Sequence, residues 1–231
     1  MRMENERRKR KKRGMLVAMK VLNLYAGIGG NRKLWKDVEV TAVEIEPHIA
    51  KVYQENFPND QVIICDAKEY LLKHFQEFDF IWASPPCPTH SRFRNLWKGD
   101  GKHITNNNKV SGSSFRLPDM DLYSIIIFLQ HFYKGVYVVE NTISYYEPLI
   151  KPFVVDNHYI WSNRNILNAK KESREIRNQD IDYKSKKIGF PLPKDIKSKR
   201  EIRKLLNNCV RPETGLHIFN SAFKTKQEVL V

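Results

Sequence analysis

The sequence predicts an α/β fold with a mostly parallel sheet. From Lys20 onward, apolar runs alternate with amphipathic segments at the spacing of strands joined by crossover helices. Several of these runs end in glycines, a cysteine or carboxylates, and strand ends of α/β folds aim such residues into the crevice above the sheet. With 231 residues, 41% of them hydrophobic, the chain can bury one substantial core. We therefore expect one main domain with small appendages.

The order of runs and segments gives the expected elements. Apolar runs predict strands at 20–25, 38–44, 61–65, 78–83, 135–140 and about 153–161. Amphipathic segments predict helices at about 30–36, 47–56, 67–74, 120–133, 199–206 and 213–223. Asp119 is the expected N-cap of the helix at 120–133. The polar stretch 89–118 is expected to be a lid or binding loop, because structureless loops of this length usually serve a function. Residues 166–200 show no clean period and predict a small, poorly packed lobe.

The net charge of +14 is concentrated in two segments. Residues 1–13 hold eight Arg/Lys against two Glu, and residues 164–204 hold fourteen Arg/Lys against six Asp/Glu. The rest of the chain is therefore close to neutral, and the first block is expected to be disordered. Two basic appendages on a neutral core favour nucleic acid as the partner over a merely solubilising role.

Composition also bears on compartment and metal content. No apolar run approaches the roughly 20 residues of a bilayer span, and no apolar region of a secretory signal follows the basic N-terminus. Cys65, Cys87 and Cys209 are few and widely spaced, which argues against a disulfide framework or a zinc cluster and for a reducing compartment. We expect a cytoplasmic monomer without metal or membrane contact, or a nuclear protein if the source is eukaryotic.

Three strand ends predict a cofactor site. The first strand runs into the glycine-rich turn 25–30, which lets the backbone approach a ligand closely, although dinucleotide and phosphate sites use similar turns. The second strand ends at Glu44 and Glu46, where such folds place a carboxylate that accepts hydrogen bonds from ribose hydroxyls. Asp66 ends the third strand and suits an adenine amino group. Each acid alone could be an ordinary strand-end residue, but the ordered set indicates a nucleotide-type cofactor.

Two further strand ends carry reactive groups. Pro85-Pro86-Cys87 follows the fourth strand, and Glu140-Asn141 ends the fifth. A thiol at such a position is a candidate nucleophile, and a carboxylate is a candidate proton donor or acceptor. The alternative is that Cys87 is a small buried hydrophobe, as free cysteine often is. Together with the cofactor turn, these residues predict a transferase that forms a covalent link to its substrate.

In these motifs the chain resembles the DNA cytosine-C5 methyltransferases. The segments that resemble family motifs are the turn 25–30 for S-adenosylmethionine, 43–58 for its ribose, Pro85-Pro86-Cys87 for the catalytic Pro-Cys, 140–142 for Glu-Asn-Val, and 206–212 for Gly-Asn-(Ser/Ala)-Val-Pro-Pro. The resemblance covers roughly residues 20–165 and 203–223. It implies a Rossmann-like S-adenosylmethionine-dependent methyltransferase fold with a very small basic lobe.

The resemblance also implies an activity and a set of residue roles. The activity is C5 methylation of cytosine in double-stranded DNA, with the base flipped out, as in restriction-modification systems. Cys87 would add to C6 of the base, Glu140 would hydrogen-bond N3 and the exocyclic amine, and Asn141 would hold the cysteine loop. The implied cofactor contacts are Tyr25, Ala26, Gly27, Gly29, Gly30, Glu44, Ile45, Asp66, Pro85 and Asn208. The implied substrate contacts are Arg92, Arg94, His158 and Arg164.

On this basis the chain divides into four parts. They are a basic disordered arm (1–19), a methyltransferase catalytic core (20–165), a small basic lobe with reduced target recognition (166–202) and a C-terminal segment that completes the cofactor pocket (203–231).

The chain also departs from the family pattern. Pro88 replaces the usual Gln, and the Gln-x-Arg-x-Arg segment that helps to hold the flipped base is not recognisable, so part of its role passes to His158 or Arg164. Two alternatives therefore stay open. One is the same chemistry on RNA, because a related branch methylates tRNA and a small lobe suits a substrate read by shape. The other is a degenerate relative that binds DNA without turnover.

Overall fold

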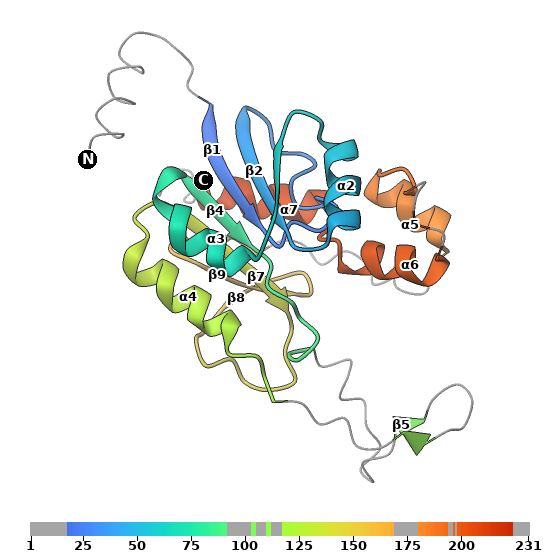
Figure 1. Ribbon diagram of the computed structural model, residues 1–231. Helices are drawn as coiled ribbons and strands as arrows, with labels where there is room; N and C mark the ends of the chain where they lie inside the picture. Colours follow the sequence, from blue (N-terminus) through green and yellow to red (C-terminus); the bar gives the residue numbers. More distant parts are fainter. Residues whose placement is uncertain are drawn as a thin grey trace.

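The computed structural model is a three-layer sandwich, with one sheet between two layers of helices (Figure 1). The structure describes residues 18–91, 103–104, 110–111, 117–168, 180–193, 196 and 198–223. None of the helices in these ranges is long and apolar enough to cross a membrane.

The central sheet has seven strands. Five are parallel: β1 (Met19–Leu24), β2 (Val38–Glu44), β3 (Gln61–Ile64), β4 (Phe80–Ala83) and β7 (Val136–Thr142). An antiparallel hairpin at one edge consists of β8 (Phe153–Val155) and β9 (His158–Ser162). The order β3-β2-β1-β4-β7-β9-β8 confirms the predicted mostly parallel sheet. Strand order reverses between β1 and β4, and such a switch point is where open α/β sheets bind ligands.

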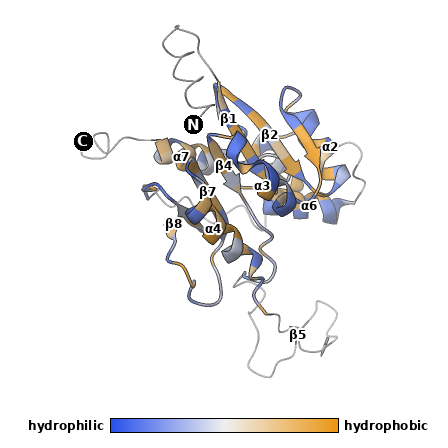
Figure 2. Cartoon of the chain, turned by 60° about the vertical axis from the view of Figure 1, so that its left-hand side comes forward, coloured by the Kyte–Doolittle hydropathy of each residue, from blue (hydrophilic) through white to orange (hydrophobic). Residues whose placement is uncertain are grey.

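Helices cover both faces of the sheet. The helices of the described residues are α2 (Pro47–Asn56), α3 (Ala67–His74), α4 (Asp121–Phe132), α5 (Ile181–Ile188), α6 (Lys199–Asn208) and α7 (Pro212–Phe223), with a short 3₁₀ helix at Phe75–Glu77. Of these, α5 and α6 lie beside α2 and not over the sheet (Figure 1). Side chains of α3 and α4 pack in one core cluster with one face of the sheet, and α7 packs in a second cluster with the other face. The strands are largely apolar, as expected for parallel strands buried on both faces (Figure 2).

The predicted helix at 30–36 is wrong. Residues 30–34 form successive turns, with backbone hydrogen bonds from Arg32 to Gly29 (3.1 Å) and from Trp35 to Arg32 (3.0 Å). Tertiary contacts account for the apolar pattern there, because the Trp35 ring stacks on Phe219 of α7 at 5.0 Å between centroids. Arg32 forms an ion pair with Asp60 at 2.9 Å, so its side chain also serves packing between segments.

Two other local expectations also need correction. The strand predicted at about 153–161 is the β8–β9 hairpin, because Asp156 has a left-handed φ of 54° and reverses the chain. The N-cap of α4 is Met120, although the Asp119 carboxylate still accepts a hydrogen bond from the Asp121 amide (2.9 Å). Within the stretch predicted as a loop, His103–Ile104 (β5) and Val110–Ser111 (β6) pair as a two-stranded ribbon.

The described part of the lobe at 166–202, from residue 180 onward, is better packed than the sequence predicted. Helices α5 and α6 share a small core with Ile28 of the glycine-rich turn and Val52 of α2. The buried side chains from this part of the chain are Ile181, Ile188, Phe190, Ile196, Ile202, Leu205 and Leu206. The division expected between residues 202 and 203 lies inside α6, so the lobe and the C-terminal segment share a helix.

Candidate active site at the carboxyl ends of the strands

The turn after β1 is held in an unusual backbone conformation. Tyr25, Gly27 and Gly29 have φ values of 56°, 55° and 85°, a left-handed region that glycine adopts at little cost and tyrosine rarely. The Gly27 amide donates to Glu44 Oε2 at 2.9 Å, which ties the turn to the end of β2. A Cβ built on Gly27 would meet nothing within 4 Å, so space is open beside this residue.

Gly29 and Gly30 have a different role from Gly27. A Cβ on Gly29 would come within 2.2 Å of Phe57, and one on Gly30 would come within 2.1 Å of Cys209 Sγ and 2.2 Å of the Val210 carbonyl oxygen. The chain's own atoms therefore occupy the space that these two glycines leave. They allow α2 and the C-terminal segment to pack on the turn, whereas Gly27 leaves room for a ligand.

The ends of β2 and β3 provide acids beside exposed apolar side chains. Glu44 is buried, and its two oxygens accept hydrogen bonds from the backbone amides of Gly27 (2.9 Å) and Glu46 (3.1 Å), which fixes the carboxylate at the strand end. Ile45 and Ile64 are 58% and 55% exposed. Ile45 and Ile64 can pack on the two faces of a flat ring, and Glu44 can accept hydrogen bonds from sugar hydroxyls.

Asp66 and Tyr25 lie at the edge of the same region. Asp66 caps α3 by accepting a hydrogen bond from the Glu69 amide at 2.9 Å. Burial raises the pKa of the Tyr25 phenol, and the nearby carboxylates of Asp66, Asp121 and Asp119 raise it further. The region around the turn is therefore acidic and keeps Tyr25 protonated, so that its hydroxyl can donate a hydrogen bond.

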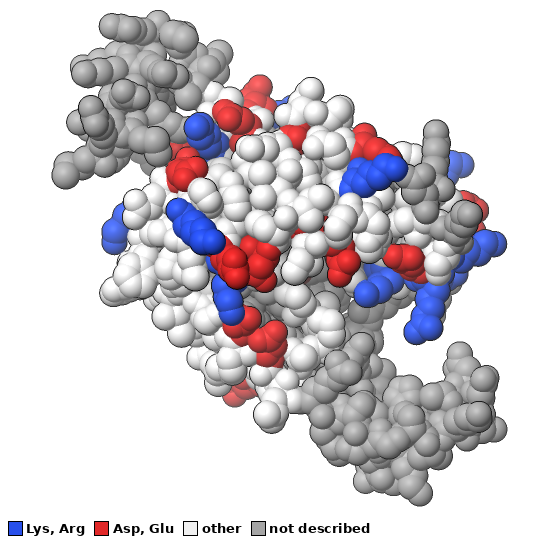
Figure 3. Space-filling model, in the orientation of Figure 1, with Lys and Arg blue, Asp and Glu red and all other residues white. Residues whose placement is uncertain are grey.

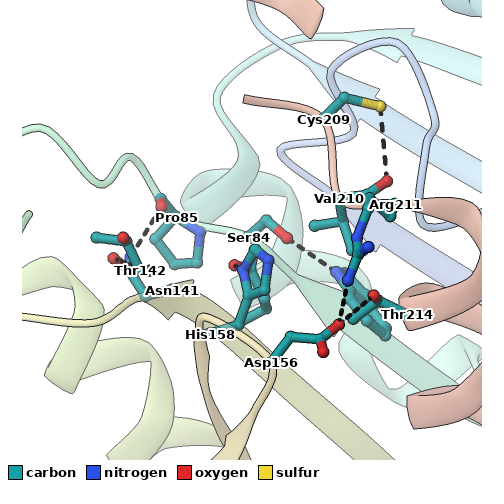
Figure 4. Close-up of polar contacts among 12 residues, drawn as sticks. Ser84, Pro85, Asn141, Thr142, Asp156, His158, Cys209, Val210, Arg211 and Thr214 are labelled. Atoms are coloured by element: carbon teal, nitrogen blue, oxygen red, sulfur yellow. Dashed lines mark hydrogen bonds and ion pairs between the residues drawn. The ribbon is translucent and has the colours of Figure 1, made fainter. Parts of the chain in front are cut away.

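The cysteine loop follows β4 and is anchored to β7. Asn141 is 1% exposed, and its Nδ2 donates to the carbonyl oxygen of Pro85 at 3.0 Å (Figure 4). Its Oδ1 accepts from the Thr142 amide at 2.9 Å, which fixes the orientation of the carboxamide. Because β4 and β7 are parallel neighbours, Cys87 and Glu140 follow strands that end at the same edge of the sheet. Cys87 is partly exposed and free of disulfides.

His90 anchors the far side of this loop. The amides of His90 and Ser91 both donate to the Cys87 carbonyl oxygen at 3.1 Å, so the chain turns directly after the cysteine. The His90 ring is 1% exposed, with Nδ1 2.6 Å from the Tyr146 hydroxyl. Burial lowers the pKa of His90, against a smaller opposite effect of Asp119. His90 is therefore neutral, and its contact with Tyr146 holds the end of the cysteine loop in place.

Glu140 is paired with His158 of the neighbouring strand. Glu140 Oε1 and His158 Nδ1 are 2.6 Å apart, and the Glu140 side chain is 9% exposed. Burial lowers the pKa of His158 and is the largest single cause, and Arg211 lowers it further, but the charge and hydrogen bond of Glu140 together with the charge of Asp156 outweigh both. The net direction is upward from the ordinary value of 6.5, so the pair favours an imidazolium beside a carboxylate.

A second ionic group lies beside this pair. Asp156 Oδ2 accepts hydrogen bonds from Arg211 Nη2 and from Thr214 Oγ1, both at 2.7 Å. Asp156 is in the β8–β9 turn, Arg211 directly precedes α7, and Thr214 lies in its first turn (Figure 4). The C-terminal segment therefore contacts the β8–β9 turn through Arg211, as well as the glycine-rich turn through Cys209.

The structure brings most of the predicted site residues to one edge of the sheet. Arg164 is the exception: it is exposed just after Ser162, which pairs with Val138, whereas Glu140 is two residues further toward the carboxyl end of β7. Because β9 is antiparallel to β7, Arg164 lies beyond the opposite end of the sheet from Glu140, so this placement does not support the predicted contact of Arg164 with substrate. Arg92 and Arg94 lie outside the described residues.

Sequence reasoning did not identify Asp156, Arg211 and Thr214 as site residues. The sequence held one signal, because Arg211 stands at the first proline of the Gly-Asn-(Ser/Ala)-Val-Pro-Pro motif that residues 206–212 resemble. Among the described residues, no group of three or more His, Cys, Asp or Glu side chains could hold a metal ion.

Comparison with known proteins identifies a family region at the N-terminal half of the sheet. Residues 19–103 match the family of C-5 cytosine-specific DNA methylases. This region includes the glycine-rich turn and Cys87, and it ends before Glu140.

Two curated relatives are tRNA (cytosine(38)-C(5))-methyltransferases. The protein from Spodoptera frugiperda is 29% identical over 104 residues, which cover 42% of this chain and 29% of the relative. The protein from Rattus norvegicus is 30% identical over 81 residues, which cover 32% of this chain and 21% of the relative. The matches therefore span less than a third of the length of either relative.

A solved structure extends the likeness to the whole fold. The Spodoptera frugiperda DNMT2 mutant E260A/E261A/K263A aligns with a TM-score of 0.53 over 89% of this chain and 100% of that chain, at 16% identity. This likeness confirms the Rossmann-like methyltransferase fold.

Proposed function

We propose that this protein belongs to the cytosine-C5 methyltransferases and methylates C5 of cytosine in nucleic acid with S-adenosylmethionine. One observation carries the proposal: a buried hydrogen bond from Asn141 to Pro85 joins the cysteine loop to the strand end that bears Glu140. A nucleophile and a carboxylate held at one sheet edge, beside a turn suited to a nucleoside, match the needs of this reaction.

The residues around the glycine-rich turn fit S-adenosylmethionine. The open space beside Gly27 admits a ligand against the backbone, and Glu44 and Asp66 are acceptors suited to ribose hydroxyls and the adenine amine. Ile45 and Ile64 supply the apolar flanks of the base. When bound, the cofactor would supply an electrophilic methyl group close to Cys87.

Cys87 is the nucleophile of this proposal. Its thiolate adds to C6 of the cytosine, which forms an S–C6 bond and makes C5 electron-rich enough to accept a methyl group. Transfer of the methyl group to C5 would leave the cofactor as its demethylated thioether. Loss of the C5 proton to solvent then breaks the S–C6 bond and restores the aromatic ring and the free thiolate. The proline-rich loop and the two amides on the Cys87 carbonyl oxygen keep the cysteine backbone fixed through both steps.

Glu140 and Asn141 support the addition step. Glu140 accepts a hydrogen bond from the exocyclic amine of cytosine, and from N3 when this atom takes up a proton as the thiolate adds. Among the described residues, its Oε2 accepts no hydrogen bond, which leaves this oxygen for the base. Asn141 holds the cysteine loop and does not itself meet the reacting atoms.

The basic face of α5 and α6 is the proposed nucleic-acid surface. Its exposed cations, which gather at one side of the molecule in Figure 3, are Lys186, Lys187, Lys199, Arg200, Arg203 and Lys204. Lysine and arginine on phosphate give affinity that is blind to sequence and falls steeply with salt. Duplex DNA, with the base flipped out, was the substrate expected from the sequence. RNA is the second candidate, because both curated relatives carry the name of a tRNA methyltransferase.

Trapping Cys87 on each polymer tests the proposal. The full chain is incubated with S-adenosylmethionine and either duplex DNA or tRNA that contains 5-fluorocytosine, and the adduct is mapped by mass spectrometry. We expect an adduct at Cys87 on one polymer, and none with Cys87→Ser, which should lose methyl transfer yet keep the melting temperature. Because an alkoxide is far less accessible than a thiolate at neutral pH, turnover of Cys87→Ser within about tenfold of the wild type would refute the role of Cys87. No adduct on either polymer would indicate a relative that binds without turnover.

A further inference from the structure

We propose that Asp156 and Arg211 are positioning residues that fix the place of His158, and that His158 in turn holds Glu140 for the substrate. The inference rests on the proposed function, because it gives Glu140 a substrate to meet. It assigns a role to an ionic group that the reaction described above does not use.

The first step is the clamp on the β8–β9 turn. Asp156 is buried, has a φ of 54° and sits two residues before His158. Aspartate tolerates this left-handed conformation better than most residues, but the conformation still needs outside support. Arg211 and Thr214 supply that support through two hydrogen bonds of 2.7 Å to the same Asp156 oxygen. The start of α7 therefore fixes where β9 begins.

The second step is the contact from β9 to Glu140. His158 opposes Thr142 in the β7–β9 register, so its ring reaches diagonally to Glu140, two residues earlier on β7. The 2.6 Å contact from Nδ1 to Glu140 Oε1 is short, as a charge-assisted hydrogen bond is. With Oε1 engaged, rotation of the carboxylate is restricted and Oε2 is directed away from His158.

The third step concerns the charges that face His158. They come from three elements: Glu140 from β7, Asp156 from the β8–β9 turn and Arg211 from the link before α7. Both carboxylates favour the imidazolium, and the guanidinium disfavours it. Asp156 and Arg211 therefore act on the protonation of His158 in opposite directions, although they share one hydrogen bond and both support the turn.

This opposition gives a test that a merely structural role would not pass. The ring nitrogen signals of His158 are titrated by NMR in the full chain without substrate and are assigned by their loss in His158→Gln. Asp156→Asn should lower the pKa of His158, because it removes a carboxylate. Arg211→Met should raise it, because it removes a cation and frees the Asp156 charge. Arg211→Lys, which keeps the positive charge, should leave the pKa of His158 near that of the wild type.

The same variants are then followed by steady-state kinetics. His158→Gln should lower kcat by about tenfold or more with little change in KM for S-adenosylmethionine, since loose positioning of a catalytic group costs about this much. In the pH profile of kcat, the alkaline limb should shift in each variant in the same direction as the pKa of His158 measured by NMR. His74→Gln is the matched control, because it breaks a similar contact with Glu77 (2.8 Å) at the exposed end of α3 and should leave kcat unchanged.

Shifts in the same direction for Asp156→Asn and Arg211→Met, or no shift in either, would overturn the inference. If Arg211→Met does not fold, the isosteric Asp156→Asn and the conservative Arg211→Lys still decide, because the first must lower the pKa and the second must not. If the wild type transfers no methyl group to DNA or RNA, the proposed function fails. The NMR titration then still reports on the clamp, so the two failures are distinguishable.

Discussion

Replacing Asn141 by alanine should impair methyl transfer far more than cofactor binding. The side chain makes two hydrogen bonds with the backbone, one to the Pro85 carbonyl oxygen (3.0 Å) and one from the Thr142 amide (2.9 Å). Its deletion leaves a buried carbonyl group without a partner in the loop that carries Cys87. The loop should then relax, while the glycine-rich turn after β1 keeps its own contacts.

The structure gives the size of the effect. A buried polar group left without a partner costs about 1–3 kcal/mol in stability. At about 2–4 °C per kcal/mol for a domain of this size, Asn141→Ala should lower the melting temperature by roughly 2–12 °C. A displacement of the nucleophile by about 1 Å can cost on the order of 100-fold in rate, so kcat should fall by about that factor.

The assay compares Asn141→Ala with a matched asparagine. Asn163 also bridges two backbone groups, the Tyr137 amide (3.2 Å) and the Gly135 carbonyl oxygen (2.8 Å), but it lies at the opposite end of β7. Asn163→Ala should lose some stability and keep kcat, whereas calorimetry should show S-adenosylmethionine bound by both variants. An Asn141→Ala enzyme with kcat within twofold of the wild type, or with the same rate as Asn163→Ala, would refute the anchoring role.

Three other predictions follow from the site and the charge distribution. Glu44→Ala should weaken S-adenosylmethionine binding at least several-fold by calorimetry, because it removes a ribose acceptor and frees the Gly27 amide, and unchanged binding would contradict the assignment. Folding raises the pKa of His158 above its value in the unfolded chain. Its contribution to the free energy of unfolding should therefore be fully present below about pH 6.5 and be lost as the pH rises through the pKa of the folded state. Denaturant unfolding across this pH range should show that loss in the wild type and not in His158→Gln. Deletion of residues 1–14, which hold six net positive charges, should weaken binding to all duplexes alike and flatten its salt dependence, and a changed set of methylated cytosines in bisulfite sequencing would contradict this.

The parallel sheet explains why much of the site could be predicted from the sequence. Carboxyl ends of parallel strands meet at one edge, so motifs that end apolar runs converge even when they are far apart in the chain. Cys87 and Glu140 were placed together on this ground alone, and the structure shows β4 and β7 as direct neighbours. Helices α2 and α3 were also predicted with the correct ends, because their amphipathic patterns lie between clear strands.

Features that depend on tertiary contacts were beyond the sequence. The segment at 30–36 has an apolar pattern that suits a helix, but contacts with Asp60 and with α7 hold it as turns. Arg164 follows an apolar strand and looked suited to bind substrate, yet the antiparallel direction of β9 places it at the opposite end of the sheet from Glu140. No local pattern reveals the direction of a strand such as β9, because a parallel and an antiparallel strand can have the same apolar run.

The contacts of the C-terminal segment were also beyond prediction from local sequence. This short stretch contacts two different parts of the site. Cys209 packs against Gly30 of the turn after β1, and Arg211, two residues later, binds Asp156 of the β8–β9 turn. Asp156 and Arg211 are 55 positions apart, so no local pattern in the sequence pairs them. Together they form an ion pair with side chains 6% and 19% exposed, and loss of either partner would leave a poorly solvated charge. Reversing the pair therefore distinguishes a specific clamp from two independent residues. The double variant Asp156→Arg with Arg211→Asp should lose less stability than the sum of the losses in the two single variants. Strictly additive losses in this double-mutant cycle would show that the two positions act independently.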